Sequence, residues 1–136
     1  MLRYMLDTNV CIHVMRHPDT PIAPRFKENE GGLCISTVTL HELQHGVEKS
    51  QRPKFQRALT LELTSRLAVL DFDANAASHS GSIHATLAKA GQLIGAYDML
   101  IAGHARSLGL IVVTNNSKEF TRVDGLRCED WLSGGA

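Results

Sequence analysis

The fold is decided near the start of the chain by the stretch LRYMLDTN, residues 2–9. Its apolar part predicts a short buried strand, which stops abruptly at Asp7 and is followed by two residue types that favour helix starts. In an open α/β sheet, ligands and catalytic groups collect at the carboxyl ends of the strands. Asp7 could therefore be a metal ligand or merely cap the next helix, and the cap is the commoner role for such an Asp taken alone.

The composition is that of one ordinary globular domain. The 136 residues are expected to form a single domain over residues 1–136, with 43% hydrophobic and 21% charged residues and a core large enough to need no disulfide. No apolar run approaches the roughly 20 residues of a membrane span, and no secretory signal is visible, so we expect a cytoplasmic protein without a membrane partner. Cys11 and Cys34 lie among apolar residues and Cys128 has no CxxC partner, so buried free thiols are expected for the first two, and a zinc site is not.

Net charge neither favours nor excludes a nucleic-acid partner, because 14 Lys and Arg balance 14 Asp and Glu. Any contact with RNA or DNA must use a local basic patch. Candidate patches lie at Arg16–His17, Arg25–Lys27 and Lys49–Arg57. Such a cluster is more commonly a solvated helix face.

Short apolar runs alternate with helical patterns along the whole chain. This alternation implies βαβ units, and the predicted fold is a three-layer α/β/α domain with a central, mostly parallel sheet. The predicted strands cover residues 2–6, 33–36, 67–71, 110–114 and 126–128; the predicted helices cover 9–15, 22–29, 38–47, 53–66, 75–90 and 98–108, with a loop at 115–120.

Several polar side chains are expected at one edge of this sheet. Asp7 ends the first strand, Glu42 lies in the first turns of the helix after the second strand, Asp98 begins a helix, and Asn116 and Glu119 follow the most strand-like stretch. Parallel strands place all their carboxyl ends at one edge, so these residues should converge. Carboxylates held together raise one another's pKa unless a cation sits among them. Oxygen ligands without a His or Cys partner select Mg²⁺ or Mn²⁺ over Zn²⁺.

Each acid also has a purely structural interpretation. Thr39 and Glu42 have the spacing of a capping box, Asp98 is a reasonable N-cap, and Glu119 could face solvent. Separately these roles are at least as common as metal binding. Together they give no reason for the acids to gather at strand ends, so the sequence favours a metal site.

The chain resembles a PIN-domain ribonuclease, and more narrowly a VapC-type toxin of a bacterial toxin–antitoxin pair. The resemblance covers essentially the whole sequence, to Leu126-Arg127 and Trp131. Its motifs are Asp7-Thr8-Asn9 after an apolar strand, Ser36 with His41-Glu42-Leu43 and Gly46, Gly95 to Asp98 with Ile101-Ala102 and His104-Ala105, and Thr114-x-Asn116-x-x-Glu119-Phe120.

The resemblance implies a PIN-like fold and a metal-dependent endoribonuclease. Asp7, Glu42 and Asp98 match the family's three acids, Asn116 stands where many members have a fourth Asp, and Glu119 stands where an Asp is usual. By this match Asp7, Glu42, Asp98 and Glu119 are the catalytic residues, and Asp7, Asp98, Glu42 and Asn116 are the ligands of Mg²⁺ or Mn²⁺. The Asn lowers the negative charge of the site, which leaves open whether one or two metal ions bind. The sequence does not distinguish Glu42 from Glu119 as the residue that takes the proton.

The resemblance also implies partners. The substrate would be RNA, namely tRNA and, by family analogy, initiator tRNA cut in its anticodon loop. The inhibitor would be a cognate VapB-type antitoxin whose Arg competes with the metal at the acids, within a homodimer and a toxin–antitoxin hetero-oligomer.

Parts of the sequence also fit other functions. His41, His45, His84 and His104 could support metal-free ribonuclease chemistry or a zinc site, but no third convergent ligand is evident, and surface or RNA-contacting roles are expected. A signalling receiver also gathers acids and Mg²⁺ at strand ends, but it would want paired acids after the first strand. A catalytically inactive PIN-like binding protein would have lost its acids, whereas only one position is substituted here.

Overall fold

The computed structural model describes residues 1–132; residues 133–136, which the predicted domain over residues 1–136 includes, lie outside the described residues. Strands and helices alternate along the described chain, as the sequence predicted. The elements are β1 (Tyr4–Leu6), α1 (Thr8–Arg16), α2 (Ile22–Glu28), β2 (Leu33–Ser36), α3 (Thr37–Glu48), α4 (Pro53–Thr64), β3 (Ala68–Leu70), α5 (Ala74–Lys89), α6 (Ala96–Leu108), β4 (Ile111–Val113), α7 (Ser117–Phe120) and β5 (Cys128–Glu129).

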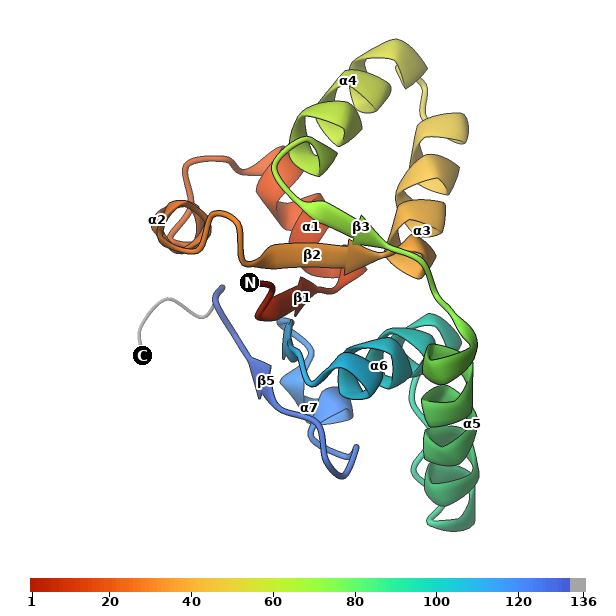
Figure 1. The fold of residues 1–136 in the computed structure, drawn as a ribbon. Helices are drawn as coiled ribbons and strands as arrows, with labels where there is room; N and C mark the ends of the chain where they lie inside the picture. The colour runs from red at the N-terminus through yellow and green to blue at the C-terminus, as the bar shows by residue number, and fades with distance from the viewer. Residues whose placement is uncertain (133–136) are drawn as a thin grey trace.

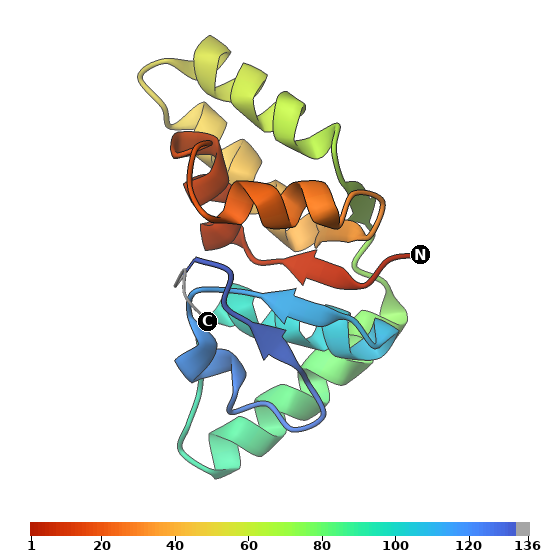
Figure 2. The same ribbon diagram turned by 90° about the vertical axis from the view of Figure 1, so that its left-hand side faces the viewer.

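The described strands form one sheet in the order β3-β2-β1-β4-β5, and each neighbouring pair is parallel. β1 lies at the centre, where Met5 pairs with Cys34 of β2 and with Val112 of β4. Figure 2 shows β1, β4 and β5 side by side. Because the strands are parallel, their carboxyl ends lie along one edge, as the predicted fold class requires.

Each face of the sheet has its own apolar core. Successive side chains of a strand point to opposite faces, so Tyr4 and Leu6 belong to one core and Met5 to the other. The first core is completed by α1, α2, α3 and α4, and the second by α5, α6 and α7. In Figure 1 the α3–α4 pair stands at one end of the molecule and the α5–α6 pair at the other, with the sheet between them.

Two predicted elements need correction. The segment 115–120, predicted as a loop, contains the one-turn helix α7, which is anchored by the fully buried ring of Phe120. The helix predicted to open at Asp98 begins two residues earlier, at Ala96, because Gly95 provides its N-cap. The remaining predicted elements are present, with boundaries that differ by a residue or two.

Two expectations from composition can be checked in the described residues. Cys11 and Cys34 are buried free thiols, as predicted, and burial raises the pKa of both. Within residues 1–132, the helices are too short or too polar to cross a membrane.

Helices α5 and α6 pack so closely that one contact leaves no room for a side chain. A Cβ added at Gly103 of α6 would lie 2.6 Å from the backbone N and Cα of Ser80 in α5. Those atoms belong to a helix backbone and cannot move independently. By contrast, a Cβ at Gly81, on α5, would meet no atom within 4 Å. The close approach therefore depends on Gly103, and it holds α6, the helix that carries Asp98, against α5.

We expect Gly103→Ala to lower the free energy of unfolding by about 1–2 kcal/mol, because the overlap outweighs the higher helix propensity of Ala. Gly81→Ala, the matched control in the neighbouring helix, should instead gain about 0.5–1 kcal/mol. Urea unfolding of both variants measures the two changes. Equal stabilisation by both substitutions would contradict the close packing.

Candidate active site

Asp7 connects the central strand to the candidate site. It follows β1 directly and is the N-cap of α1, where its Oδ1 accepts a hydrogen bond of 2.9 Å from the amide of Val10. The residue is only 1% exposed, and its second oxygen, Oδ2, is buried without a hydrogen-bond partner among the described residues. The capping role is therefore real, but it uses one oxygen and leaves the other for a proton or a cation.

The pKa of Asp7 is raised above its ordinary value. Burial is the main cause, and the negative charges of Glu42 and Asp130 act in the same direction, while the Thr114 side chain and the Val10 amide oppose it. Without a positive partner, the ionised form of this carboxyl is thus destabilised by its surroundings.

Glu42 is held by α1 and not by the start of its own helix. The N-cap of α3 is Ser36, whose Oγ accepts from the Val38 amide at 3.0 Å, so Glu42 lies in the second turn and forms no capping box with Thr39. Its Oε1 instead accepts a 2.5 Å hydrogen bond from the Thr8 hydroxyl, which lies 3.2 Å from Thr39 Oγ1. This contact joins the first turn of α1 to α3 and sets the position of Glu42 relative to Asp7.

Asp98 lies in the first turn of α6, three residues after the N-cap Gly95, and does not cap the helix. The pKa of Asp98 is raised from 3.8 to about 7. Burial is the largest cause, followed by a hydrogen bond with the Glu119 side chain and by the charges of Asp7, Glu119 and Glu42. The charges of the three other acids all raise the pKa of Asp98, so the predicted catalytic carboxylates lie in one region of the fold.

Asn116 and Glu119 are joined to each other beside this group. The Asn116 amide Nδ2 donates a 2.5 Å hydrogen bond to Glu119 Oε2, and the Asn116 backbone amide donates to Thr114 Oγ1 at 2.8 Å. Glu119 thus accepts from Asn116 and pairs with Asp98. The hydrogen bond with Glu119 and the Glu119 charge both raise the pKa of Asp98.

The donor set fits a hard divalent cation, although the side chains do not form a closed cage. Among residues 1–132, no three Asp, Glu, His or Cys side chains converge tightly enough to hold a metal ion. Like charges keep carboxylates apart until a cation neutralises them. The unsatisfied Asp7 Oδ2, the raised pKa of Asp7 and Asp98, and the all-oxygen ligand set are the features that Mg²⁺ or Mn²⁺ would satisfy.

His104 occupies a different place from the one expected. It was predicted to lie on the surface or to contact RNA, but it is buried in α6 with Nδ1 2.8 Å from Ser36 Oγ. Burial lowers the pKa of His104, which keeps the ring neutral. The contact ties α6 to the N-cap of α3, so it fixes the helices that carry Asp98 and Glu42 relative to each other. Ser36 and His104 were among the motif residues, but only the structure reveals their pairing.

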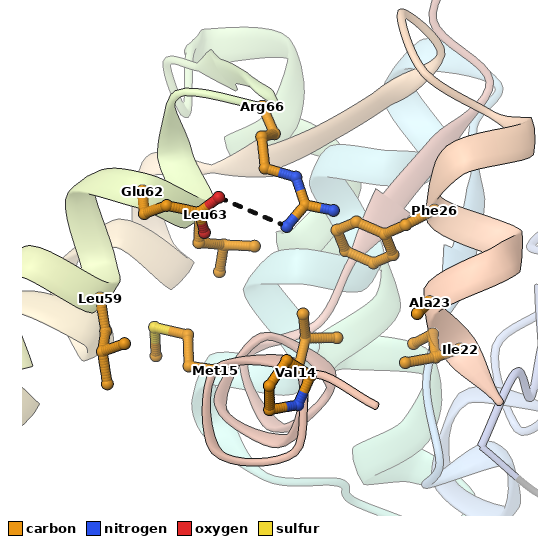
Figure 3. Close-up of a pocket in the computed structure, with 10 residues that line it drawn as sticks. Val14, Met15, Ile22, Ala23, Phe26, Leu59, Glu62, Leu63 and Arg66 are labelled. Carbon is orange, nitrogen blue, oxygen red and sulfur yellow. Dashed lines mark ion pairs between the residues drawn. The ribbon is translucent and has the colours of Figure 1, made fainter. Parts of the chain in front are cut away.

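Two hollows lie along α1, and one of them borders the site acid Glu42. The first, of about 390 Å³, is lined by Thr8, Glu42 and Tyr97 together with basic side chains of α1 and α3. The second, of about 120 Å³, is mainly apolar and is shown in Figure 3, where Arg66 lies over Phe26 and pairs with Glu62. Met15 lines both hollows, so they are neighbours along α1.

Comparison with known proteins defines the family. The PIN domain model matches residues 4–126. The tRNA(fMet)-specific endonuclease VapC of Shigella flexneri is 53% identical over 131 residues, which cover 96% of this chain and 99% of that protein. The chain belongs to the VapC ribonucleases of the PIN-domain family. The enzyme of the same description from Salmonella typhimurium is 50% identical with the same coverage.

The fold agrees with this membership. The crystal structure of DNA-bound VapBC from Salmonella typhimurium contains a chain that is 50% identical and superposes with a TM-score of 0.94, covering 96% of this chain and 99% of that one. As a VapC-family protein, the molecule is a ribonuclease and the toxin member of a toxin–antitoxin pair, as the sequence resemblance implied. The receiver alternative fails, because receivers have the strand order 2-1-3-4-5, whereas the order here is β3-β2-β1-β4-β5.

The raised pKa of Asp98 predicts how the stability of the metal-free protein depends on pH. The carboxyl titrates near 3.8 when unfolded and at about 7 when folded, so its stabilising, protonated form is lost as pH rises from about 4 through 7. We therefore expect Asp98→Asn to match the wild type near pH 4, to gain on it as the pH rises, and to be more stable than it by about 1–2 kcal/mol at pH 8, after allowance for solvent screening.

Thermal unfolding in EDTA between pH 4 and pH 8 measures this difference. Asp19→Asn, at an exposed position of the α1–α2 connection, is the matched control and should follow the wild type at every pH. A constant difference between wild type and Asp98→Asn across this range would contradict the raised pKa.

Proposed function

We propose that this VapC-family ribonuclease cuts tRNA, and specifically initiator tRNA, in the cytoplasm and thereby stops translation. The observation that carries the proposal is the convergence of Asp7, Glu42, Asp98 and Glu119 at the sheet edge of a chain whose half-identical relatives are tRNA(fMet)-specific endonucleases. The buried free thiols Cys11 and Cys34 suit a reducing cytoplasm.

The cofactor of this proposal is Mg²⁺ or Mn²⁺. Asp7 and Asp98 are its principal ligands, and Glu42 and Asn116 are further oxygen ligands. When bound, such an ion acidifies a water molecule and stabilises the leaving oxygen of a phosphodiester. Such an ion would favour the ionised form of Asp98 and would give the buried Oδ2 of Asp7 a partner.

The other side chains orient the acids and move protons. The Thr8 hydroxyl holds Glu42, and the Asn116 amide holds Glu119. One of these two glutamates accepts a proton from the attacking water as a new P–O bond forms. The bond from phosphorus to the 3′-oxygen then breaks, and that oxygen takes the proton from the glutamate to become a 3′-hydroxyl. The upstream fragment thus ends in a 3′-hydroxyl and the downstream one begins with a 5′-phosphate.

The proposed partners are a VapB-type antitoxin and a second copy of the chain, in a toxin–antitoxin hetero-oligomer. The Salmonella typhimurium relative was crystallised as VapBC with DNA. In this protein, an antitoxin segment with apolar side chains would fit the hollow of Figure 3 and continue past Met15 to the carboxylates. There an Arg would compete with the metal through its positive charge.

Metal removal tests the ligand assignment. EDTA should abolish cleavage and Mg²⁺ should restore it. Asp7→Asn and Asp98→Asn should each lower kcat/KM more than about 100-fold, because even an outer residue that orients a ligand is worth about 10- to 100-fold. Thr8→Val, which removes the hydroxyl that holds Glu42, should fall within that smaller range.

The control for this test is that the variants remain folded. Asn is as good an N-cap as Asp, so Asp7→Asn keeps the α1 cap and should remain folded. Full activity of the wild type in EDTA, or of Asp7→Asn with Mg²⁺, would overturn the metal assignment.

The ends of the RNA products separate this chemistry from a metal-free, histidine-based mechanism. If water is the nucleophile, the 2′-hydroxyl takes no covalent part, and a substrate with one 2′-deoxy sugar at the cut should still be cleaved to a 5′-phosphate and a 3′-hydroxyl. Sequencing of RNA 5′ ends after a short pulse of expression locates the cut. If the deoxy substrate resists cleavage and the normal substrate yields a 2′,3′-cyclic phosphate, the histidines and not a metal ion would be responsible for catalysis.

A further inference from the structure

An exposed pair of aromatic rings stands beside the carboxylates. His41 of α3 and Tyr97 of α6 each immediately precede an acid of the site, Glu42 and Asp98. The Tyr97 hydroxyl is 3.3 Å from His41 Nε2, and the ring centroids are 5.7 Å apart with planes tilted by 46°. Tyr97 is 46% exposed, so the pair contacts across two helices without being buried between them.

The two rings line the hollow of about 390 Å³ that also contains Thr8 and Glu42. This volume lies within the usual range of small-ligand sites, about 300–1,000 Å³. The pair therefore shares one cavity with Glu42, and a group stacked on the rings would lie beside this acid.

The same hollow carries positive charge. Its lining includes Arg16 at the end of α1 and His45 and Lys49 at the end of α3, against the single acid Glu42. Within the described chain, neither Arg16 nor Lys49 forms an ion pair, so both cations are available to phosphate groups. The net charge of the whole protein is zero, so the composition gives no sign of this local excess of positive charge.

We propose that His41 and Tyr97 form a stacking platform for an unpaired base of the RNA substrate, with Arg16 and Lys49 holding the adjoining phosphates. The inference rests on the proposed cleavage of RNA and adds the residues that position the strand. Proteins recognise single-stranded RNA by stacking splayed bases on Tyr and His rings and by tracking the backbone with cations. An anticodon loop offers such bases, whereas the base-paired arms of a tRNA do not.

The hydrogen bond between the rings has a different role from the rings themselves. It sets their relative tilt, but stacking needs only the ring face. Tyr97→Phe keeps the face and removes the hydroxyl, so it should bind RNA within about threefold of the wild type, whereas Tyr97→Ala should raise KM by about 5- to 100-fold with a smaller change in kcat. His41→Ala should act in the same direction.

Matched controls come from exposed rings elsewhere. Phe55 of α4 is 50% exposed and has Arg52 above its ring, and His84 of α5 is exposed; neither lines the hollow. Phe55→Ala and His84→Ala should leave KM unchanged. Thermal unfolding of all variants should stay close to the wild type, because each substituted ring is exposed.

The deciding experiment combines the protein variants with changes in the RNA. The probe is the anticodon stem-loop of initiator tRNA, with each loop nucleotide replaced in turn by an abasic residue, and binding is measured in the Asp7→Asn background with Mg²⁺. At one loop position the abasic change should weaken binding to the parent protein by about 5- to 100-fold. The same change should have no further effect on Tyr97→Ala, because the lost partner is the same.

Each other outcome overturns the platform in a recognisable way. Additive effects at every loop position mean that no base stacks there. Equal losses for Tyr97→Phe and Tyr97→Ala mean that the pair serves only as a hydrogen-bonded link between α3 and α6. If the wild type cuts the stem-loop but Tyr97→Ala behaves like Phe55→Ala, the platform fails while the proposed function stands. If the wild type cuts no RNA, both fail.

Discussion

The half-satisfied carboxylate of Asp7 is the constraint on which the site depends. One oxygen caps α1 and so belongs to the fold, while the other is buried without a partner among the described residues. Such a group is unfavourable unless it binds a proton or a cation. Neighbouring acids add to this effect. The charge of Glu42 raises the pKa of Asp7, and the charges of Glu42 and Asp7 both raise the pKa of Asp98. These carboxylates therefore destabilise the metal-free protein, and a bound divalent ion would restore that stability. Catalytic sites commonly show this pattern.

This repulsion persists because the surrounding helices are fixed by contacts away from the acids. The Ser36–His104 contact ties α3 to α6, the Thr8–Glu42 hydrogen bond ties α1 to α3, and the close approach at Gly103 holds α6 against α5. Two separate cores then hold the helices to opposite faces of one sheet. The carboxylates therefore stay near enough to act on one another, and the raised pKa of Asp98 is the consequence.

The surroundings of the acids divide into surfaces of different chemistry. The hollow beside Glu42 is polar and basic, which suits a nucleic-acid backbone and an unpaired base. The hollow of Figure 3 is apolar, which suits a protein segment. Met15 borders both.

The sequence by itself determined the fold class, the parallel sheet and the acids at its edge, because strand periodicity and the position of Asp7 after an apolar run are local properties of the chain. The family motifs determined the enzyme class in the same way. Tertiary structure alone decided that the capping box at Thr39 does not form, that Asp98 sits inside its helix, that segment 115–120 contains α7, and that His104 is buried. It also paired His41 with Tyr97, 56 residues apart. These features depend on which helices meet, and the contacts between helices are set by packing across the sheet, which no local pattern encodes.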